Sequence, residues 1–191
     1  MGLISLIVGG AMDAHKAIKQ SNAQDNDEVN RVVVKGLYSM DVPTFLSERD
    51  DLSEDASLQY GNNTLDIALQ VLDEPKDEFL EALEELDVEL PTLGEHNTPL
   101  DKMATMTICN YYDDLDKVEL NDYEETRING LRAVTVNGFQ KRTFFNDAVF
   151  TSFAFIEGRE TMYQIMVVSG GSSISKLAEK MDKCIYSFRE L

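Results

Sequence analysis

The sequence predicts an α+β protein in which helices pack on an antiparallel β-sheet, preceded by an N-terminal helix. Long stretches of the C-terminal half alternate apolar and polar residues and are joined by short turn signals. Segments that begin at Pro75 and Pro99, and a third that closes the chain, instead show the apolar spacing of helices. Because strands and helices do not alternate one by one, the pattern favours segregated helices over a doubly wound parallel sheet.

Composition limits the classes of function. The 191 residues, 43% of them hydrophobic, suit one domain with a sizeable core. The formal net charge is −18. A polyanion would repel this chain, so we expect no nucleic-acid binding, and adhesion to an anionic membrane is disfavoured for the same reason.

The negative charge is concentrated in the first two thirds of the chain. Residues 1–130 carry a net charge of −20, whereas residues 131–191 carry +2. Asp73–Glu89 and Asp113–Glu125 together hold 16 acids. The simplest interpretation is a solvated face that keeps the protein soluble. The alternative is a surface that steers a basic protein partner toward this part of the molecule.

The N-terminal segment predicts a separate amphipathic helix. Residues 1–20 have helical apolar spacing, residues 21–30 form a polar linker, and residues 31–191 form the domain. The helix must bury its apolar face on its own domain, on a second copy or on another protein, so a homo-oligomer remains open. The residues of that face that we expect to contact a partner are Ile4, Ile7 and Val8.

The start of the chain does not resemble an export signal. No Lys or Arg precedes the six-residue apolar run Leu3–Val8, and no stretch has the length of a membrane span. If Met1 is the native start, we expect a cytoplasmic protein. If a signal was removed, we expect a periplasmic or envelope protein. Cys109 and Cys184 occupy core-facing positions of predicted helices, which favours buried thiols and leaves a disulfide between them open.

The first strands follow from short apolar runs. Val32–Tyr38 predicts one strand that ends near Pro43, because proline cannot donate to a ladder. An acidic loop, Ser47–Asp55, comes next. A hairpin then follows, with alternation at Leu58 and Tyr60, a turn at 61–63, and renewed alternation over Leu65–Val71.

Two helices come before the meander. Pro75 ends a strand and opens the first helix, whose apolar face includes Phe79 and Leu83. Thr98 is placed to cap the second helix and Pro99 to begin it. The apolar face of the second helix consists of Leu100, Met103, Ala104, Thr107, Ile108, Tyr111 and Leu115.

The remaining strands form an antiparallel meander. Asn129-Gly130 is a hairpin-turn signal ahead of Leu131–Phe139. Thr143–Ile156 and Thr161–Ser169 follow, and the part Val149–Ile156 is nearly all apolar or aromatic on both faces, as expected for a central strand covered on both sides. The closing helix carries Ile174, Leu177, Ala178, Met181 and Ile185 and is capped by Ser172 or Ser173.

Catalytic and metal-binding patterns are missing from the sequence. His15 and His96 have no histidine or cysteine at ligand spacing. The carboxylates of Asp113–Glu119 lack the glycine of a calcium loop, and Gly170–Ser173 lacks the lysine of a phosphate-binding loop. We therefore expect no enzyme, and no catalytic, metal-binding or cofactor-binding residues.

Short phrases in the domain resemble the PsbP/DcrB-like superfamily, also called Mog/PsbP-like. They are Tyr38-Ser39-Met40-Asp41-Val42-Pro43, Ile128-Asn129-Gly130-Leu131-Arg132-Ala133, Met162-Tyr163-Gln164-Ile165 and Ile185-Tyr186-Ser187-Phe188. The resemblance covers residues 31–191 and implies an α/β/α sandwich. The superfamily includes photosystem accessory subunits, a Ran-binding protein, bacterial envelope lipoproteins and the Eag chaperones of type VI secretion. It therefore implies a binding or assembly factor with no catalytic residues to carry over.

The leading hypothesis is thus a non-catalytic, protein-binding or chaperone-like accessory protein. Its contact surface would be the exposed face of the sheet or the edge of the meander. The aromatic candidates, each of which also suits the core, are Phe139, Phe144, Phe145, Phe150 and Tyr163. One alternative is a subunit of a larger, secretion-type assembly docked by the helix over residues 1–20. Another is a small-ligand or enzyme site between helices and sheet, built on Asp113, Asp114 and Asp116.

Overall fold

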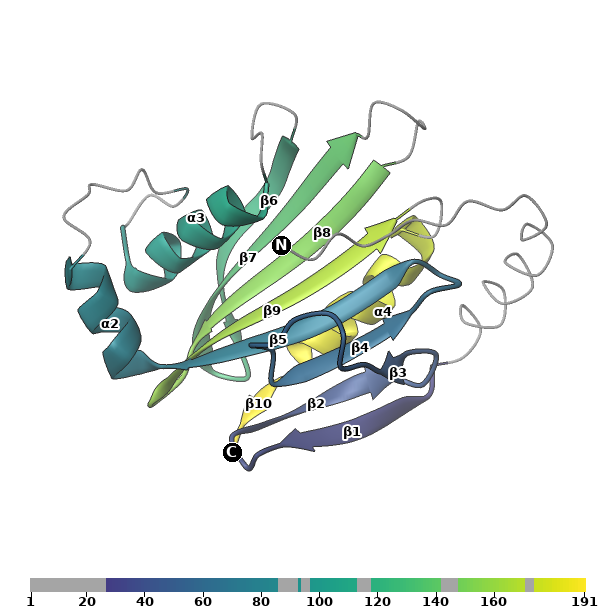
Figure 1. The fold of residues 1–191 in the computed structure, drawn as a ribbon, viewed down its shortest axis with the longest axis horizontal. Helices are drawn as coiled ribbons and strands as arrows, with labels where there is room; N and C mark the ends of the chain where they lie inside the picture. Colours follow the sequence, from purple (N-terminus) through teal and green to yellow (C-terminus); the bar gives the residue numbers. More distant parts are fainter. Residues whose placement is uncertain (1–26, 86–92, 94–96, 113–117, 142–147, 171–173) are drawn as a thin grey trace.

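The structure, a computed structural model, describes residues 27–85, 93, 97–112, 118–141, 148–170 and 174–191. It contains two antiparallel sheets and three helices within these residues (Figure 1). The strands are β1 (Val29–Val34), β2 (Tyr38–Pro43), β3 (Ser47–Glu48), β4 (Leu58–Asn62), β5 (Ile67–Pro75), β6 (Val118–Ile128), β7 (Leu131–Lys141), β8 (Ala148–Glu157), β9 (Thr161–Gly170) and β10 (Arg189–Glu190). The helices are α2 (Lys76–Glu85), α3 (Pro99–Tyr111) and α4 (Ile174–Tyr186).

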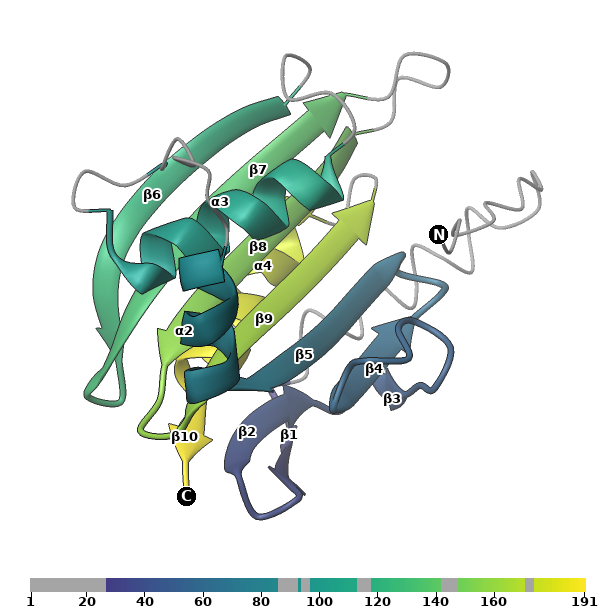
Figure 2. The same ribbon diagram turned by 60° about the vertical axis from the view of Figure 1, so that its left-hand side comes forward.

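The large sheet has seven strands in the order β3-β4-β5-β9-β8-β7-β6, and the small sheet has the order β1-β2-β10. Helices α2 and α3 lie on one face of the large sheet, and α4 lies on the other (Figure 2). The small sheet lies beside α4, because β2 contacts that helix. The predicted α+β sandwich is therefore confirmed, whereas the helix predicted over residues 1–20 lies outside the described residues.

Two apolar clusters fill the faces of the large sheet. Strand β8 serves both, because Phe153 and Phe155 pack with α3 whereas Ala154 and Ile156 pack with α4. All four side chains are fully buried. This arrangement confirms that Val149–Ile156 is a central strand covered on both sides, and it explains why both sets of alternating residues are apolar.

The first predicted strand is wrong as a single strand, because the chain folds back within it. Lys35 and Gly36 both have positive φ, and the Leu37 N–H donates to the Val34 carbonyl at 2.8 Å. This tight turn joins β1 and β2 into a hairpin in which Val34 is paired with Tyr38. Lysine is a rare residue at the first turn position, so the usual Asn-Gly signal is missing. Strand β1 begins at Val29, so the last two residues of the predicted linker belong to it.

The helix start predicted at Thr98 is confirmed in detail. The Thr98 hydroxyl accepts from the Asp101 N–H at 3.2 Å, and the Asp101 carboxylate accepts from the Thr98 N–H at 2.8 Å. This capping box satisfies two amides that the helix itself leaves unpaired. The turn at Asn129-Gly130 is likewise confirmed, since both residues have positive φ between β6 and β7.

Three further expectations differ from the structure or lie outside it. The loop predicted over Ser47–Asp55 begins with the two-residue strand β3, which pairs with β4. Cys109 is exposed, contrary to the prediction of a buried thiol, whereas Cys184 is buried and both cysteines are free. The strand predicted from Thr143 is described only from Ala148, and the cap predicted at Ser172 or Ser173 lies outside the described residues.

Candidate functional site

A polar pocket lies between the N-terminal end of α3 and the hairpin formed by β6 and β7. Its volume is about 280 Å³, and its walls include Thr98 and Leu100 from α3 and Val134 from β7. Two arginines complete it: Arg127 on β6 and Arg132 on β7, which are direct partners across the ladder. The turn at 129–130 fixes this register, so both arginine side chains lie on the face of the sheet that α3 covers. We call this the arginine pocket.

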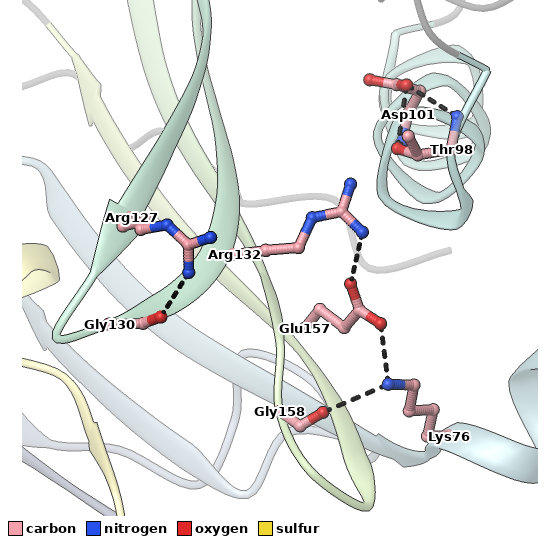
Figure 3. Close-up of polar contacts among 8 residues, drawn as sticks. All are labelled: Lys76, Thr98, Asp101, Arg127, Gly130, Arg132, Glu157 and Gly158. Carbon is pink, nitrogen blue, oxygen red and sulfur yellow. Dashed lines mark hydrogen bonds and ion pairs between the residues drawn. The ribbon is translucent and has the colours of Figure 1, made fainter.

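The two guanidinium groups each contact one acceptor within the described part of the chain (Figure 3). Arg127 Nη1 donates to the Gly130 carbonyl at 2.8 Å. Arg132 Nη1 donates to Glu157 Oε2 at 3.2 Å, and the other oxygen of Glu157 pairs with Lys76 Nζ at 2.7 Å. One carboxylate is thus shared by two cations. Each guanidinium carries five N–H donors, so this network uses only some of the N–H donors of the two arginines.

The buried carboxylate of Asp101 stabilises the wall of the pocket at the start of α3. Asp101 is fully buried and accepts from the Thr98 hydroxyl at 2.9 Å as well as from the Thr98 N–H. The Tyr123 hydroxyl of β6 donates to the other oxygen of the same carboxylate. Burial, and then this contact with Asp101, raise the pKa of Tyr123. The hydrogen bonds therefore anchor the start of α3 to the strand that carries Arg127.

The second surface is the outer edge of β1, which we call the β1 edge. Among the described residues, strand β1 ends the small sheet and pairs only with β2. The Thr44 N–H donates to the Glu28 carbonyl at 3.0 Å, and bonded pairs alternate along an antiparallel ladder. The backbone groups of Val29, Arg31 and Val33 therefore point away from β2. No described residue donates to or accepts from these groups.

The β1 edge combines exposed valine side chains with mixed apolar and polar surroundings. Val29 is 51% exposed and Val33 is 61% exposed. A groove of about 320 Å³ runs along the end of β1. Its lining includes Val32, Val33, Val34, Ala56, Leu58 and Tyr60, together with the polar residues Lys35, Glu48, Arg49, Asp50, Ser57 and Gln59. The two cations and two acids among these residues balance, so the groove carries no net charge.

The edges of the large sheet are less open to another strand. Strand β3 has only two residues. Strand β6 has eleven, but its register shifts between Asn121 and Glu124, and Asp122 within this bulge has positive φ. Exposed Glu119, Glu124 and Glu125 add charge along the same strand. Bulges and charges are common means of preventing edge-to-edge pairing, so the meander edge suits a partner strand less well than the β1 edge.

The residues predicted to contact a partner remain largely untested. Phe139 lies on β7, is half-buried, and pairs with half-buried Phe150 on β8. Ile4, Ile7, Val8, Phe144 and Phe145 lie outside the described residues. Tyr163 is buried in the core and contacts the rings of Tyr38 and Phe188.

Sequence reasoning missed both the arginine pair and the β1 edge. The pair had a local signal, because residues placed two before and two after an Asn-Gly turn face each other across a hairpin. The β1 edge had none, because its recognition requires the β1–β2 turn and the strand order.

No group of three His, Cys, Asp or Glu residues that could hold a metal ion occurs among the described residues. His15, His96 and Asp113, Asp114 and Asp116 lie outside them. None of the helices within the described ranges is both long and apolar enough to cross a membrane.

Comparisons with known proteins show similarity of structure. No family model and no curated sequence matches the chain. Cyanobacterial PsbP from Synechocystis sp. PCC 6803 is 13% identical with a TM-score of 0.56, over 97% of this chain and 98% of that one. The Ran-binding protein Mog1p of Saccharomyces cerevisiae is 11% identical with a TM-score of 0.54, over 84% of this chain and 94% of that one. A point mutant of Mog1 gives a TM-score of 0.52 at 11% identity, over 84% of this chain and 95% of that one.

These identities are low, and the similarity therefore concerns the fold. The two sheets, the two helices on one face and the closing helix on the other cover nearly the full length of the solved structures. The chain therefore has a fold similar to those of PsbP and Mog1p.

Proposed function

We propose that this protein is a non-catalytic binding protein that takes up an extended segment of a partner protein at the β1 edge. The observation that carries the proposal is the edge of β1, whose outward backbone groups bond to no described residue and which exposes the side chains of Val29 and Val33. An added strand gains main-chain hydrogen bonds from such an edge and specificity from alternate side chains. The resemblance to a fold that includes a Ran-binding protein agrees with a role in protein binding.

The geometry favours one kind of segment. Three residues of β1, namely Val29, Arg31 and Val33, offer outward N–H and C=O groups, so a segment of about six residues would pair with them. Every second side chain of that segment would face the groove, where Leu58 and Tyr60 supply apolar surface. Because the groove has no net charge, we expect uncharged, β-branched or aromatic residues at these positions.

The acidic surface would act at longer range. Helix α2 exposes Asp77, Glu78 and Glu81, and β6 exposes further acids. A basic protein would be attracted to this field before its extended segment reaches β1, and the association rate would fall with salt. The proposal thus combines a basic partner with an uncharged binding segment.

A test is site-specific photo-cross-linking with a photoreactive phenylalanine analogue at Val33 in the native host. We expect one discrete cross-linked protein at this position. A matched probe at Glu124 on the bulged β6 edge should yield none. Cross-links at Glu124 and none at Val33 would overturn the assignment of the surface.

A backbone variant tests the strand-addition mode itself. Val33→Pro removes one outward N–H without removing a bond to β2, and proline is tolerated at such edge positions. Cross-linking from a probe at Val29 should then be lost, whereas Val33→Thr, which keeps the N–H, should retain it. Equal yields from the two variants would exclude pairing through the backbone.

A further inference from the structure

The arginine pocket presents an electrostatic arrangement that the fold alone does not need. Arg127 and Arg132 are direct cross-strand partners on the face toward α3. Like charges directly opposite each other destabilise a sheet, and nothing in the β6–β7 turn requires arginine at both positions. The chain as a whole has 35 acids and only 17 bases, so two arginines placed directly opposite each other are an uncommon arrangement for it.

We propose that the arginine pocket binds a single carboxylate group carried on a short aliphatic stem. A carboxylate between the two guanidinium groups would accept paired N–H donors from each and would relieve their repulsion. The side chains of Leu100 and Val134 line the pocket beside the arginines and are buried, so they offer apolar contact to the stem. The pocket is thus polar where the arginines lie and apolar toward α3.

The charges around the pocket favour a monoanion over a phosphate dianion. Glu157 already lies against Arg132, and Glu125 lies in the pocket wall. These carboxylates leave at most a small positive excess from Lys76, Arg127 and Arg132, which suits one negative charge. The amides at the start of α3 offer little as an alternative site, because the capping box uses those of Thr98 and Asp101 and Pro99 has no N–H.

Two kinds of ligand could supply this carboxylate, and the two arginines would bind both in the same way. It belongs either to a free small acid or to a protein, as a Glu or Asp side chain or a chain terminus. The pocket is independent of the β1 edge, because it is built from α3, β6 and β7 rather than from the small sheet. Failure of either proposal therefore leaves the other standing.

The test is a titration of the full-length protein followed through the arginine Nε–Hε resonances at constant ionic strength. Propionate is the probe, propionamide is its neutral control, and inorganic phosphate is the competing anion. We expect saturable shifts of Arg127 and Arg132 with propionate at a millimolar dissociation constant, on the order of that expected for so small a ligand. Propionamide should give none, and phosphate should bind more weakly.

Variants assign the effect to the pocket. Arg127→Gln or Arg132→Gln should weaken propionate binding about tenfold to a hundredfold, the value of a charge-assisted pair. Arg31→Gln, which removes a cation paired with Asp41 on the small sheet, should not change it. An unchanged amide spectrum away from the substitution shows that each variant is folded.

Peptides separate the two sources. Short peptides with a free C-terminus, with an amidated C-terminus, or with one internal Glu are titrated in the same way. Tighter binding of a carboxylate-bearing peptide than of propionate indicates a protein ligand, and the reverse indicates a free acid. Absence of saturable arginine shifts with every carboxylate, or equal shifts with propionamide, would overturn the proposal.

Discussion

Removal of one phenol should loosen the start of α3 by a measurable amount. In Tyr123→Phe the hydroxyl that donates to Asp101 is lost, while the ring remains against the α3 side of the sheet. Asp101 is fully buried, so water cannot replace this donor. A hydrogen bond to a charged acceptor contributes about 1.5–3 kcal/mol, so we expect the free energy of unfolding to fall by about 2 kcal/mol. For a domain of this length that is a decrease in Tm of about 4–8 °C.

Urea and thermal unfolding followed by circular dichroism measure this change. Thr98→Ala removes the hydroxyl of the capping box and should cost about 1 kcal/mol. Because both side chains contact the same carboxylate, the double variant should depart from additivity. Tyr60→Phe is the matched control, since this half-buried phenol donates to no described residue. A loss below about 0.5 kcal/mol for Tyr123→Phe would refute the account of Asp101 as a shared anchor.

Three further predictions concern the two cysteines, Gly138 and the titration of Tyr123. Exposed Cys109 should react rapidly with a thiol reagent in the native protein, whereas Cys184, whose pKa burial raises to about 12, should react only after unfolding. Gly138→Ala should lower the free energy of unfolding by about 1–3 kcal/mol, because the new Cβ would overlap the Tyr112 hydroxyl; adding Tyr112→Phe should recover part of the loss. The raised pKa of Tyr123 means that the folded state holds the phenol proton more tightly than the unfolded state does. The free energy of unfolding should therefore decrease as the pH rises above about 10. This decrease should be smaller in Tyr123→Phe.

The fold could be predicted well where local signals agreed with the tertiary structure. Thr98 and Pro99 placed a helix start, and Asn129-Gly130 placed a turn, because each position has a direct backbone requirement. The nearly all apolar or aromatic stretch over Val149–Ile156 indicated a strand between two layers of side chains, as the two clusters on β8 show.

The candidate surfaces could not be predicted because they depend on long-range pairing. Lys35-Gly36 turns through two residues with positive φ, as Asn129-Gly130 does, but lysine is only rarely found in that conformation. Without that turn, β1 and β2 are predicted as one strand, and the free edge of β1 is not predicted. The exposure of Cys109 on α3 was missed because a helix of mixed composition presents apolar residues at its border as well as on its buried face.

The predicted contact residues of the sheet were the aromatic Phe139, Phe144 and Phe145. The exposed apolar residues of β1 are instead valines. The contact predicted for those phenylalanines, and for the helix over residues 1–20, stays a prediction.

Residue-resolved amide hydrogen exchange on β1 tests the central claim most directly. In the free protein the amides of Val29, Arg31 and Val33 should exchange rapidly, while those of Asn30 and Val32, bonded to β2, exchange slowly. When the cross-linked partner, or its isolated binding segment, is added, we predict that the three outward amides become at least about tenfold slower. Unchanged exchange on β1 in the presence of the bound partner, or new protection confined to β6, would contradict binding by strand addition at this edge.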